Sequence, residues 1–271
     1  MQKTIYFDGK QFVEARKEEL VAQVKLLKAK GVIPKLVSLV VGDEESAVKY
    51  QELKRRRAQE IGAVVEIAQF NKNETFAELV QFIEKLNEDE KVHGVMIQLP
   101  LPRSLKNRTE ELINKISKTK DVDGMRDDSQ FVAPVVLAVK AALNDALRVV
   151  RPKKTNEKLA ICVVGAGFVG KKIIKHLKEV GFSNTYGVDT GVQKLSQETL
   201  KAHVIVSSTG KANLITEKMV KTDSMLIDVG APFGEITASA SKKAVFTTPV
   251  PGGIGPVTIY FLLFNLIKTI G

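Results

Sequence analysis

One stretch near the middle of the chain constrains the fold more than any other. It reads LAICVVGAGFVGKKIIKHLKEVG from Leu159 to Gly181, an apolar run followed by a glycine-rich turn and an amphipathic segment. Gly165, Gly167 and Gly170 have the spacing G-x-G-x-x-G between a predicted strand and a predicted helix. That order is typical of a Rossmann-type unit, in which the helix N-terminus receives a pyrophosphate. The sequence therefore predicts a parallel α/β sheet here.

An acidic residue stands where such units contact the ribose of the cofactor. Asp189 ends the next apolar run, 24 residues after Gly165. A carboxylate there accepts hydrogen bonds from the adenosine ribose hydroxyls and repels a 2′-phosphate. We therefore expect NAD to be preferred over NADP.

The rest of the chain alternates apolar, β-branched runs with amphipathic segments. Strands are expected at 35–43, 63–70, 92–102, 184–189, 202–209, 224–230 and 244–248, and helices at 11–30, 46–62, 74–88, 104–117 and 135–150. This βαβ order favours mostly parallel sheets. We predict an α/β fold with two domains: an N-terminal unit over 1–139 plus 255–271, and a Rossmann-type dinucleotide-binding unit over 140–254. The C-terminal helix is expected to return to the first unit.

Composition excludes several classes of protein. The chain has 271 residues, 44% of them hydrophobic, and no apolar run approaches the ~20 residues that span a bilayer. The first ten residues lack the pattern of a signal peptide. With Cys162 as the only cysteine and three histidines, neither an intrachain disulfide nor a metal site is expected. We expect a cytoplasmic protein that has no membrane partner.

The net charge of +10 indicates anionic ligands without specifying which. The lysines are dispersed along the chain, and with no Trp and four Tyr it has few aromatic groups on which single strands could stack. A small anionic substrate or cofactor therefore explains the charge as well as nucleic acid does, and we expect no nucleic-acid partner. Binding to DNA or RNA that depended steeply on salt would contradict this expectation.

A run of cations raises a separate question. The segment YQELKRRRAQEIGA contains Lys54, Arg55, Arg56 and Arg57 in succession on a predicted helix. Such a run is usually a solvated helix face. Tyr50, however, precedes Lys54 by one helical turn and lies on the same face, from which the arginines are rotated away.

Several long motifs point to a known family. The chain contains GVMIQLPLP (94–102), KDVDG (120–124), IDVG (227–230) and TPVPGGIGPVT (248–258). With Tyr50-x-x-x-Lys54, it resembles the bifunctional methylenetetrahydrofolate dehydrogenase/cyclohydrolases over nearly its whole length. The resemblance implies oxidation of 5,10-methylenetetrahydrofolate to 5,10-methenyltetrahydrofolate with NAD(P), then hydrolysis to 10-formyltetrahydrofolate. It also implies a homodimer formed through the dinucleotide-binding unit.

The resemblance assigns roles to individual residues. Lys54 matches the catalytic lysine, Gln98 the glutamine that hydrogen-bonds it, and Asp123 the aspartate that holds the pterin. Tyr50 matches the tyrosine that stacks on the folate. The expected substrate-binding residues are Tyr50, Gln98, Pro100, Asp123, Gly252 and Gly253. The expected cofactor-binding residues are Gly165, Ala166, Gly167, Phe168, Val169, Gly170, Asp189, Thr190, Thr209, Gly210, Val229, Gly230, Gly253 and Thr258.

The chain departs from the family pattern at three places. Ala47 replaces a serine of the folate site, and Val135 and Val136 follow Pro134 where the family has Cys-Thr. At the dinucleotide site, Ala166 and Gly167 stand where the family commonly has Arg-Ser in the glycine turn. Thr190 and Gly191 stand where it commonly has Ser-Arg after the next strand, so the residues that would hold a 2′-phosphate are missing from both places. Lys194 is the nearest cation in the sequence that could replace that arginine.

Two other functions remain open at the sequence level. A Rossmann dehydrogenase acting on another small substrate would explain the glycine turn, but not Lys54, Gln98 and Asp123 together. A non-catalytic protein that binds a folate or a nucleotide would explain Ala47 and the missing Cys-Thr. Formation of methenyltetrahydrofolate by the purified protein would discriminate between these alternatives and the enzyme.

Overall fold

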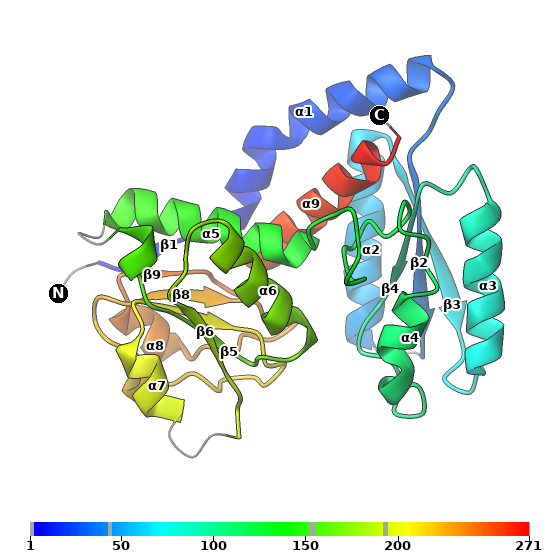
Figure 1. Ribbon diagram of the computed structural model, residues 1–271. Coiled ribbons are helices and arrows are strands. Elements are labelled where there is room, and N and C mark those ends of the chain that lie inside the picture. Colours follow the sequence, from blue (N-terminus) through cyan, green and yellow to red (C-terminus); the bar gives the residue numbers. More distant parts are fainter. Residues whose placement is uncertain (1–2, 43–44, 152–154, 192–194, 271) are drawn as a thin grey trace. The chain divides into compact units, whose positions relative to one another are not determined.

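The computed structural model describes residues 3–42, 45–151, 155–191 and 195–270, with the side chains of 45–49 outside the description. The side chain of Ala47 and the whole of Lys194 therefore lie outside it. The chain forms two compact units. Unit 1 comprises Met1–Val13 and Val135–Thr258, and unit 2 comprises Glu14–Pro134 and Ile259–Gly271. The chain crosses between the units within three helices, α1 (Gly9–Ala29), α5 (Pro134–Val150) and α9 (Ile254–Lys268) (Figure 1).

The first residues belong to unit 1, which corrects the expected boundary. We expected residues 1–139 to lie with the folate site, but β1 (Ile5–Tyr6) pairs in parallel with β9 (Phe246–Thr247). The Phe7 amide extends this pairing by donating to the carbonyl of Thr247 at 2.9 Å. A strand of two residues is too short to give a periodic pattern, so the sequence analysis missed it. The expected return of the C-terminal helix to the other unit is confirmed.

Unit 1 is built on a six-stranded parallel sheet with the order β1-β9-β8-β7-β5-β6. Its other strands are β5 (Ile161–Val164), β6 (Thr185–Val188), β7 (Val204–Ser207) and β8 (Met225–Asp228). Helices α5 and α6 (Phe168–Glu179) cover one face, and α7 (Leu195–Lys201) and α8 (Ala238–Lys243) the other (Figure 1). The chain leaves β5 toward β6 and returns to β7 on the other side of β5. Ligands of open α/β sheets bind at such a switch, beyond the carboxyl ends of the strands.

One face of β5 packs against α7 and α8. Cys162 and Val164 join a cluster of buried apolar residues that includes Leu195 of α7 and Ala240 of α8. Burial raises the pKa of the Cys162 thiol to about 12. The thiol is therefore a core group without nucleophilic character at neutral pH.

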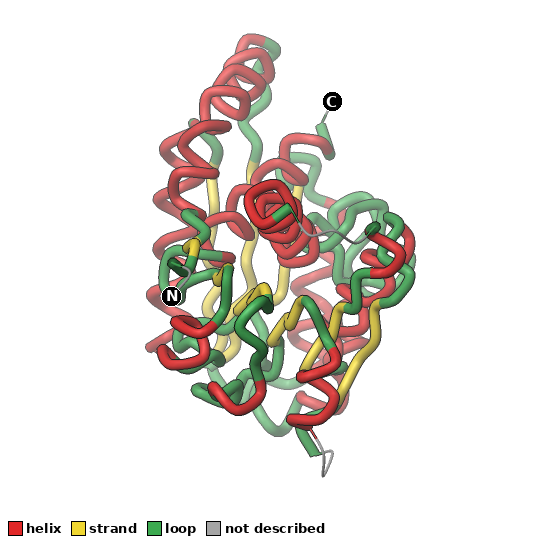
Figure 2. Tube along the Cα trace, turned by 90° about the vertical axis from the view of Figure 1, so that its left-hand side faces the viewer, coloured by secondary structure: helices red, strands yellow, loops and turns green. Residues whose placement is uncertain are grey.

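Unit 2 contains a three-stranded parallel sheet with the order β3-β2-β4. The strands are β2 (Lys35–Val41), β3 (Val64–Phe70) and β4 (Gly94–Ile97), and the helices within the unit are α2 (Glu45–Ile61), α3 (Phe76–Glu88) and α4 (Thr109–Ile113). Because β4 lies on the opposite side of β2 from β3, right-handed crossovers place α2 and α3 on opposite faces (Figure 1). Figure 2 shows the helices, strands and loops of the chain from a second direction. The three expected strands and helices α2 and α3 are confirmed.

Three short 3₁₀ turns complete the described elements: Lys106–Arg108, Asn156–Lys158 and Glu217–Met219. The sequence overextended two elements of unit 2. The third strand ends at Ile97 and not at 102, because prolines 100 and 102 have no N–H for a ladder. The helix expected over 104–117 is reduced to α4, and the chain continues as a hydrogen-bonded loop. Helices α7 and α8 of unit 1 were not anticipated.

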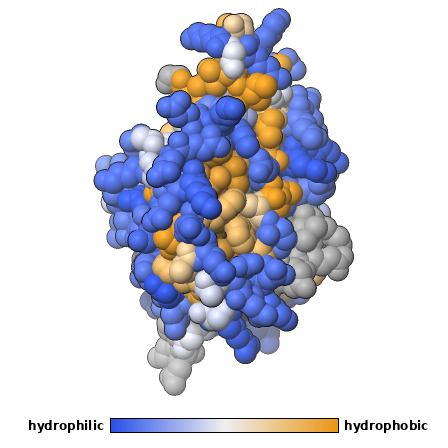
Figure 3. All heavy atoms as spheres, turned by 90° about the vertical axis from the view of Figure 1, so that its right-hand side faces the viewer, coloured by the Kyte–Doolittle hydropathy of each residue, from blue (hydrophilic) through white to orange (hydrophobic). Residues whose placement is uncertain are grey.

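Hydrophilic side chains cover most of the face shown in Figure 3, with apolar ones gathered in a band across its middle. Within the described residues, no helix combines the length and apolar character needed to cross a membrane.

Candidate active site

Helix α2 presents one buried face that carries polar side chains. Gln51, Lys54 and Ala58 are spaced as neighbours on that face and are 1%, 2% and 0% exposed. Arg55 and Arg56 are exposed and pair with glutamates of the same helix. The solvated-face interpretation therefore holds for these two arginines but is wrong for Lys54, as the spacing from Tyr50 indicated.

The Lys54 ammonium is held by groups from α2 and from the end of β4. Its Nζ donates to Gln98 Oε1 at 2.8 Å, lies 3.5 Å from Met96 Sδ, and is 4.6 Å from the centroid of the Tyr50 ring. Gln98 Nε2 donates to the carbonyl of Leu99 at 2.7 Å, which turns the glutamine oxygen toward the lysine. The structure thus brings Tyr50, Lys54 and Gln98 together.

Burial sets the proton affinity of this lysine. It lowers the pKa of Lys54 to about 8, although the negative charge of Asp123 acts in the opposite direction. Burial, supported by Asp123, also raises the pKa of Tyr50 far above its ordinary value, so the phenol stays neutral. An amine with a pKa close to neutral pH both accepts and donates protons efficiently, which is what general acid–base chemistry requires.

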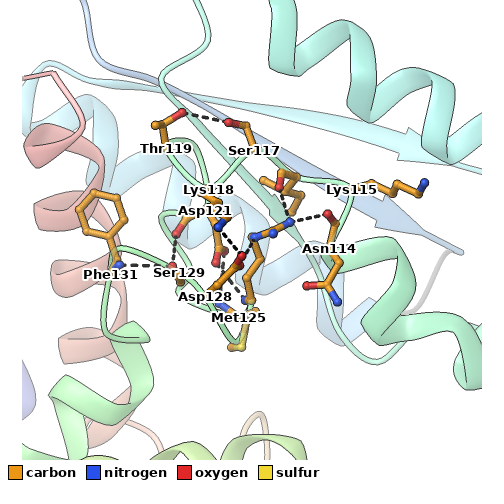
Figure 4. Close-up of polar contacts among 12 residues, drawn as sticks. Asn114, Lys115, Ser117, Lys118, Thr119, Asp121, Met125, Asp128, Ser129 and Phe131 are labelled. Carbon is orange, nitrogen blue, oxygen red and sulfur yellow. Dashed lines mark hydrogen bonds and ion pairs between the residues drawn. The ribbon is translucent and has the colours of Figure 1, made fainter.

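The loop that carries Asp123 is anchored by the other acid of the same motif. Asp121 is fully buried and accepts hydrogen bonds from the amides of Met125 and Arg126 at 3.2 and 3.0 Å. Its backbone carbonyl accepts from the Ser129 hydroxyl at 3.3 Å (Figure 4). The first acid of DVDG therefore shapes the loop, and the second acts electrostatically on Lys54 and Tyr50.

Two further side chains fasten this loop, and the sequence analysis missed both. The Arg126 guanidinium donates to the carbonyls of Asn114 and Ile116 and pairs with Asp128 (Figure 4). Asn265 of α9 donates from Nδ2 to the carbonyls of Val122 and Val132 at 2.9 and 3.1 Å. An amide inside the otherwise apolar run VTIYFLLFNLI was the signal that could have revealed Asn265.

The glycine turn of unit 1 has the geometry that its spacing indicated. Gly165 has φ +88°, and a Cβ there would lie 2.5 Å from the Ser208 carbonyl oxygen. A Cβ at Gly170 would lie 2.0 Å from the Gly165 oxygen, so the helix packs directly on the turn. Gly167, by contrast, faces open space. Gly167 is the N-cap residue of α6 and has no side chain that could accept a hydrogen bond. The N–H groups of the first turn of α6 therefore have no side-chain acceptor from the N-cap. These residues fit a dinucleotide pyrophosphate.

Two buried carboxylates organise the loops that follow β7 and β8. Glu235, 2% exposed, accepts from the Thr209 amide and hydroxyl, the Gly210 amide and the Ser207 hydroxyl, at 2.5–3.0 Å. Asp228 accepts from the amides of Gly230, Glu235 and Ile236 at 2.8–2.9 Å. Burial raises the pKa of the Asp228 carboxyl, and these backbone donors oppose that rise. The backbone N–H groups of Thr209, Gly210 and Gly230 therefore donate to buried carboxylates within the protein.

Replacing Glu235 by Ala is expected to lower the affinity for the dinucleotide and the stability of the protein. The change leaves several buried donors without an acceptor, and each unpaired group costs about 1–3 kcal/mol. Thermal unfolding and the KM for the dinucleotide measure the two effects. The exposed Glu217 offers a matched control, and its replacement by Ala should leave both quantities near those of the parent.

The remaining candidates of unit 1 lie at strand or helix ends. Asp189 is exposed directly after β6, and the Thr190 hydroxyl accepts from Lys211 Nζ at 2.9 Å. The Gly252 carbonyl accepts from the Gly9 amide at 2.9 Å. These contacts place the start of α1 beside Gly252, and Lys211, which follows β7, beside Thr190. The sequence analysis had treated these segments separately.

Four other expected residues lie in loops or, in the case of Thr258, within α9. The Gly253 amide donates to the carbonyl of Pro249 at 2.8 Å, and the Thr258 hydroxyl to that of Ile254 at 3.1 Å within α9. Val229 continues the β7–β8 pairing through its amide, and Pro100 is exposed beyond β4. In the described part of the chain, no three His, Cys, Asp or Glu side chains group as a metal site would require.

Comparison with known proteins identifies the two parts of the chain as domains of one family. Residues 7–123 match the catalytic-domain model of tetrahydrofolate dehydrogenase/cyclohydrolase, and residues 145–271 match its NAD(P)-binding-domain model. The chain is 33% identical to the bifunctional protein FolD of Bacillus velezensis over 97% of its own length and 96% of that protein's.

Solved structures agree along the whole chain. The bifunctional FolD of Campylobacter jejuni superposes with a TM-score of 0.85 at 29% identity, covering 98% of each chain. The Trypanosoma brucei methylenetetrahydrofolate dehydrogenase-cyclohydrolase, solved with NADP and an inhibitor, also gives 0.85 at 25% identity, covering 99% of this chain and 98% of that one. On these grounds the chain belongs to the tetrahydrofolate dehydrogenase/cyclohydrolase family.

Proposed function

We propose that Lys54, oriented by Gln98, is the proton-transfer group of the hydrolytic step in a two-step reaction. The chain is a bifunctional enzyme of one-carbon metabolism. It oxidises 5,10-methylenetetrahydrofolate to 5,10-methenyltetrahydrofolate and hydrolyses that product to 10-formyltetrahydrofolate. The observation that supports the role of Lys54 is its burial beside Gln98, with a pKa of about 8.

The proton balance of hydrolysis defines what Lys54 has to do. In the first step a nicotinamide dinucleotide, when bound, takes a hydride from the bridging carbon and leaves a cation. Water adds to that carbon and loses one proton, the bond to N5 breaks as N5 gains a proton, and the second proton of the water leaves as the formyl C=O forms, so the reaction releases one proton overall. A single amine can accept the first proton and donate it to N5. The neutral form of Lys54 is the one that starts the cycle.

The neighbours of Lys54 are suited to a cationic folate. Gln98 presents an oxygen and Asp123 a negative charge. We assign Asp123 to the pterin, the Tyr50 ring to stacking on the folate, and Pro100, Gly252 and Gly253 to substrate binding. An absorbance assay of the purified protein tests the function, because methenyltetrahydrofolate should form with a dinucleotide and then decay. Protein that forms no methenyl product with either dinucleotide would contradict it.

The choice between NAD and NADP rests on the end of β6. Asp189 places an exposed carboxylate there, and at ~4 Å and an effective dielectric of ~20 each unit like-charge pair costs about 4 kcal/mol before screening. Lys211, whose ammonium reaches Thr190, is a cation on the same side that could offset part of this repulsion. The NADP-bound trypanosomal relative shows that this fold also accepts a 2′-phosphate. We propose NAD as the preferred cofactor, because Gly191 supplies no guanidinium.

Asp189→Ser combined with Gly191→Arg is expected to shift the preference toward NADP by at least about tenfold in kcat/KM, since the change removes a carboxylate and adds a cation. Lys211→Ala should weaken NADP further and leave NAD nearly unaffected. Steady-state kinetics with both dinucleotides measure these effects. A parent enzyme with the higher kcat/KM for NADP would refute the role given to Asp189.

Two finer properties complete the proposal. We place the enzyme in the cytoplasm as a homodimer that forms through the dinucleotide-binding unit, as the family resemblance implies. Light scattering of the purified protein decides its state, since a monomer at micromolar concentration would refute the dimer.

A further inference from the structure

Gln51 is a buried polar residue to which the reaction described so far gives no role. Its side chain is 1% exposed on the same face of α2 as Lys54. Its Nε2 donates to Gln98 Oε1 at 2.7 Å, the oxygen that also accepts from Lys54 Nζ at 2.8 Å. Its own Oε1 is buried and accepts no hydrogen bond. A buried acceptor without a donor lowers stability, so packing alone gives no reason for an amide at this position.

The amides of Gln51 and Gln98 fix one another's orientation. Gln98 Nε2 is engaged by the Leu99 carbonyl, so Oε1 faces Lys54 and Gln51. If the Gln98 amide turned over, its NH₂ would face the NH₂ of Gln51 and the ammonium of Lys54, three donors without an acceptor. When Lys54 is neutral, the same rotation of the Gln98 amide would let its NH₂ group donate to the lone pair of the lysine amine. Gln51 opposes both outcomes and leaves that lone pair free for a proton from the substrate water.

The shared oxygen also affects the charged state. Lys54 and Gln51 both donate to the Gln98 side-chain oxygen, and the positive end of the Gln51 amide lies beside the lysine. Both effects disfavour the ammonium form relative to a site with one donor. The titratable groups acting on Lys54 are Tyr50 of α2 and Asp123 of the loop beyond β4, whereas Met96 and Gln98 are uncharged. Of these groups, Asp123 alone carries a charge that favours the ammonium.

We propose that Gln51 is a positioning residue of the hydrolytic step, which holds the Gln98 oxygen toward Lys54 and, as a second donor on that oxygen, keeps the lysine ready to accept a proton. The proposal rests on the role given to Lys54 above. It adds a residue that is 1% exposed and acts through Gln98.

The test compares Gln51→Leu, which removes the donor, with Gln51→Glu, which places a carboxylate beside the lysine. Gln59→Leu makes the same chemical change at an exposed position of α2 and serves as the control. The readouts are the pH profile of methenyl hydrolysis from about pH 6 to about pH 10, and the titration of the Lys54 amine by NMR, its signal assigned with Lys54→Met. Gln51→Met replaces Gln51→Leu if the latter does not fold.

Gln51→Leu should move the titration of Lys54 and the matching limb of the profile to higher pH by ~0.5–1 unit, which slows hydrolysis at pH 7 by roughly 3–10-fold. Gln51→Glu should move both further, and Gln59→Leu should move neither. An unchanged titration in Gln51→Leu, with any lost activity accompanied by lost stability, would reduce Gln51 to a packing residue. Full hydrolysis by Lys54→Met would instead overturn the role of the lysine, and the NMR titration would still decide what Gln51 does to it.

Discussion

Lys54→Met is expected to lower the rate of methenyl hydrolysis by at least ~10²-fold, the usual scale for loss of a general acid–base group. The same substitution should stabilise the protein at pH 7. Catalytic groups that are held in an unfavourable state often show this combination of lost activity and gained stability. A lysine with only a structural role would show the opposite, because its removal would cost stability together with activity.

The sign of the stability change follows from the pKa of Lys54. The unfolded lysine has its ordinary value of 10.5 and the folded one about 8, so the unfolded state binds more protons between these values. The buried Lys54 therefore lowers the free energy of unfolding by the full amount below about pH 8, and this destabilisation disappears as the pH rises past 10.5. A fall of this size corresponds to about 3 kcal/mol. Methionine fills a similar volume, and Gln98 Oε1 retains its hydrogen bond from Gln51.

Urea unfolding of the parent and of Lys54→Met at about pH 7 and about pH 10.5 measures this linkage. The stabilisation, up to about 3 kcal/mol at the lower pH, should shrink at the higher one. Arg56→Met is the matched control on the exposed side of α2, and it should change hydrolysis and stability little. Equal losses of activity in the two variants would contradict the proton-transfer role of Lys54.

Deletion of residues 257–271 is expected to abolish the folding of unit 2 and with it folate binding. Six apolar side chains of α9 from Ile259 onward are buried: Ile259, Tyr260, Leu262, Leu263, Leu266 and Ile267. Complete burial of such a side chain contributes ~1.5–3 kcal/mol, so the helix supplies roughly 9–18 kcal/mol. Whole domains are stable by only ~5–15 kcal/mol. The deletion also removes Asn265, which holds the loop of Asp123.

A point variant keeps this prediction quantitative. Leu266 packs so closely on β4 that a Cβ at Gly94 would lie 2.9 Å from its Cδ1. Leu266→Ala should therefore cost ~2–5 kcal/mol, the range for a leucine in a rigid core. Lys268→Ala, on the exposed side of the same helix, should stay within about 0.5 kcal/mol. Limited proteolysis, urea unfolding and folate titration provide the measurements. A truncated chain that folds and keeps its folate affinity would contradict the role of α9.

The strands and the main helices were predictable because each satisfies a local rule. The run from Leu159 to Gly181 predicted a strand, a turn and a helix, and the structure has β5, the Gly165 turn and α6 in that order. Local rules failed at β1, which has two residues and exists only because it pairs with β9. They also failed at 104–117, where hydrogen bonds to Arg126 and Asn87 favour a loop over a longer helix.

The sequence by itself determined the α/β class, the dinucleotide turn and the family motifs, because spacing and residue type are visible along one dimension. It also placed Tyr50 and Lys54 on one helix face, because helical periodicity is local. Only the tertiary structure decided that this face is buried, that Gln51 and Lys54 share one oxygen of Gln98, and that Asn265 fastens the loop of Asp123. These contacts join residues separated by 44 to 143 positions in the chain. Burial then altered the chemistry, since the same ammonium that water would stabilise on an exposed arginine-rich helix has, inside the protein, a pKa close to neutral.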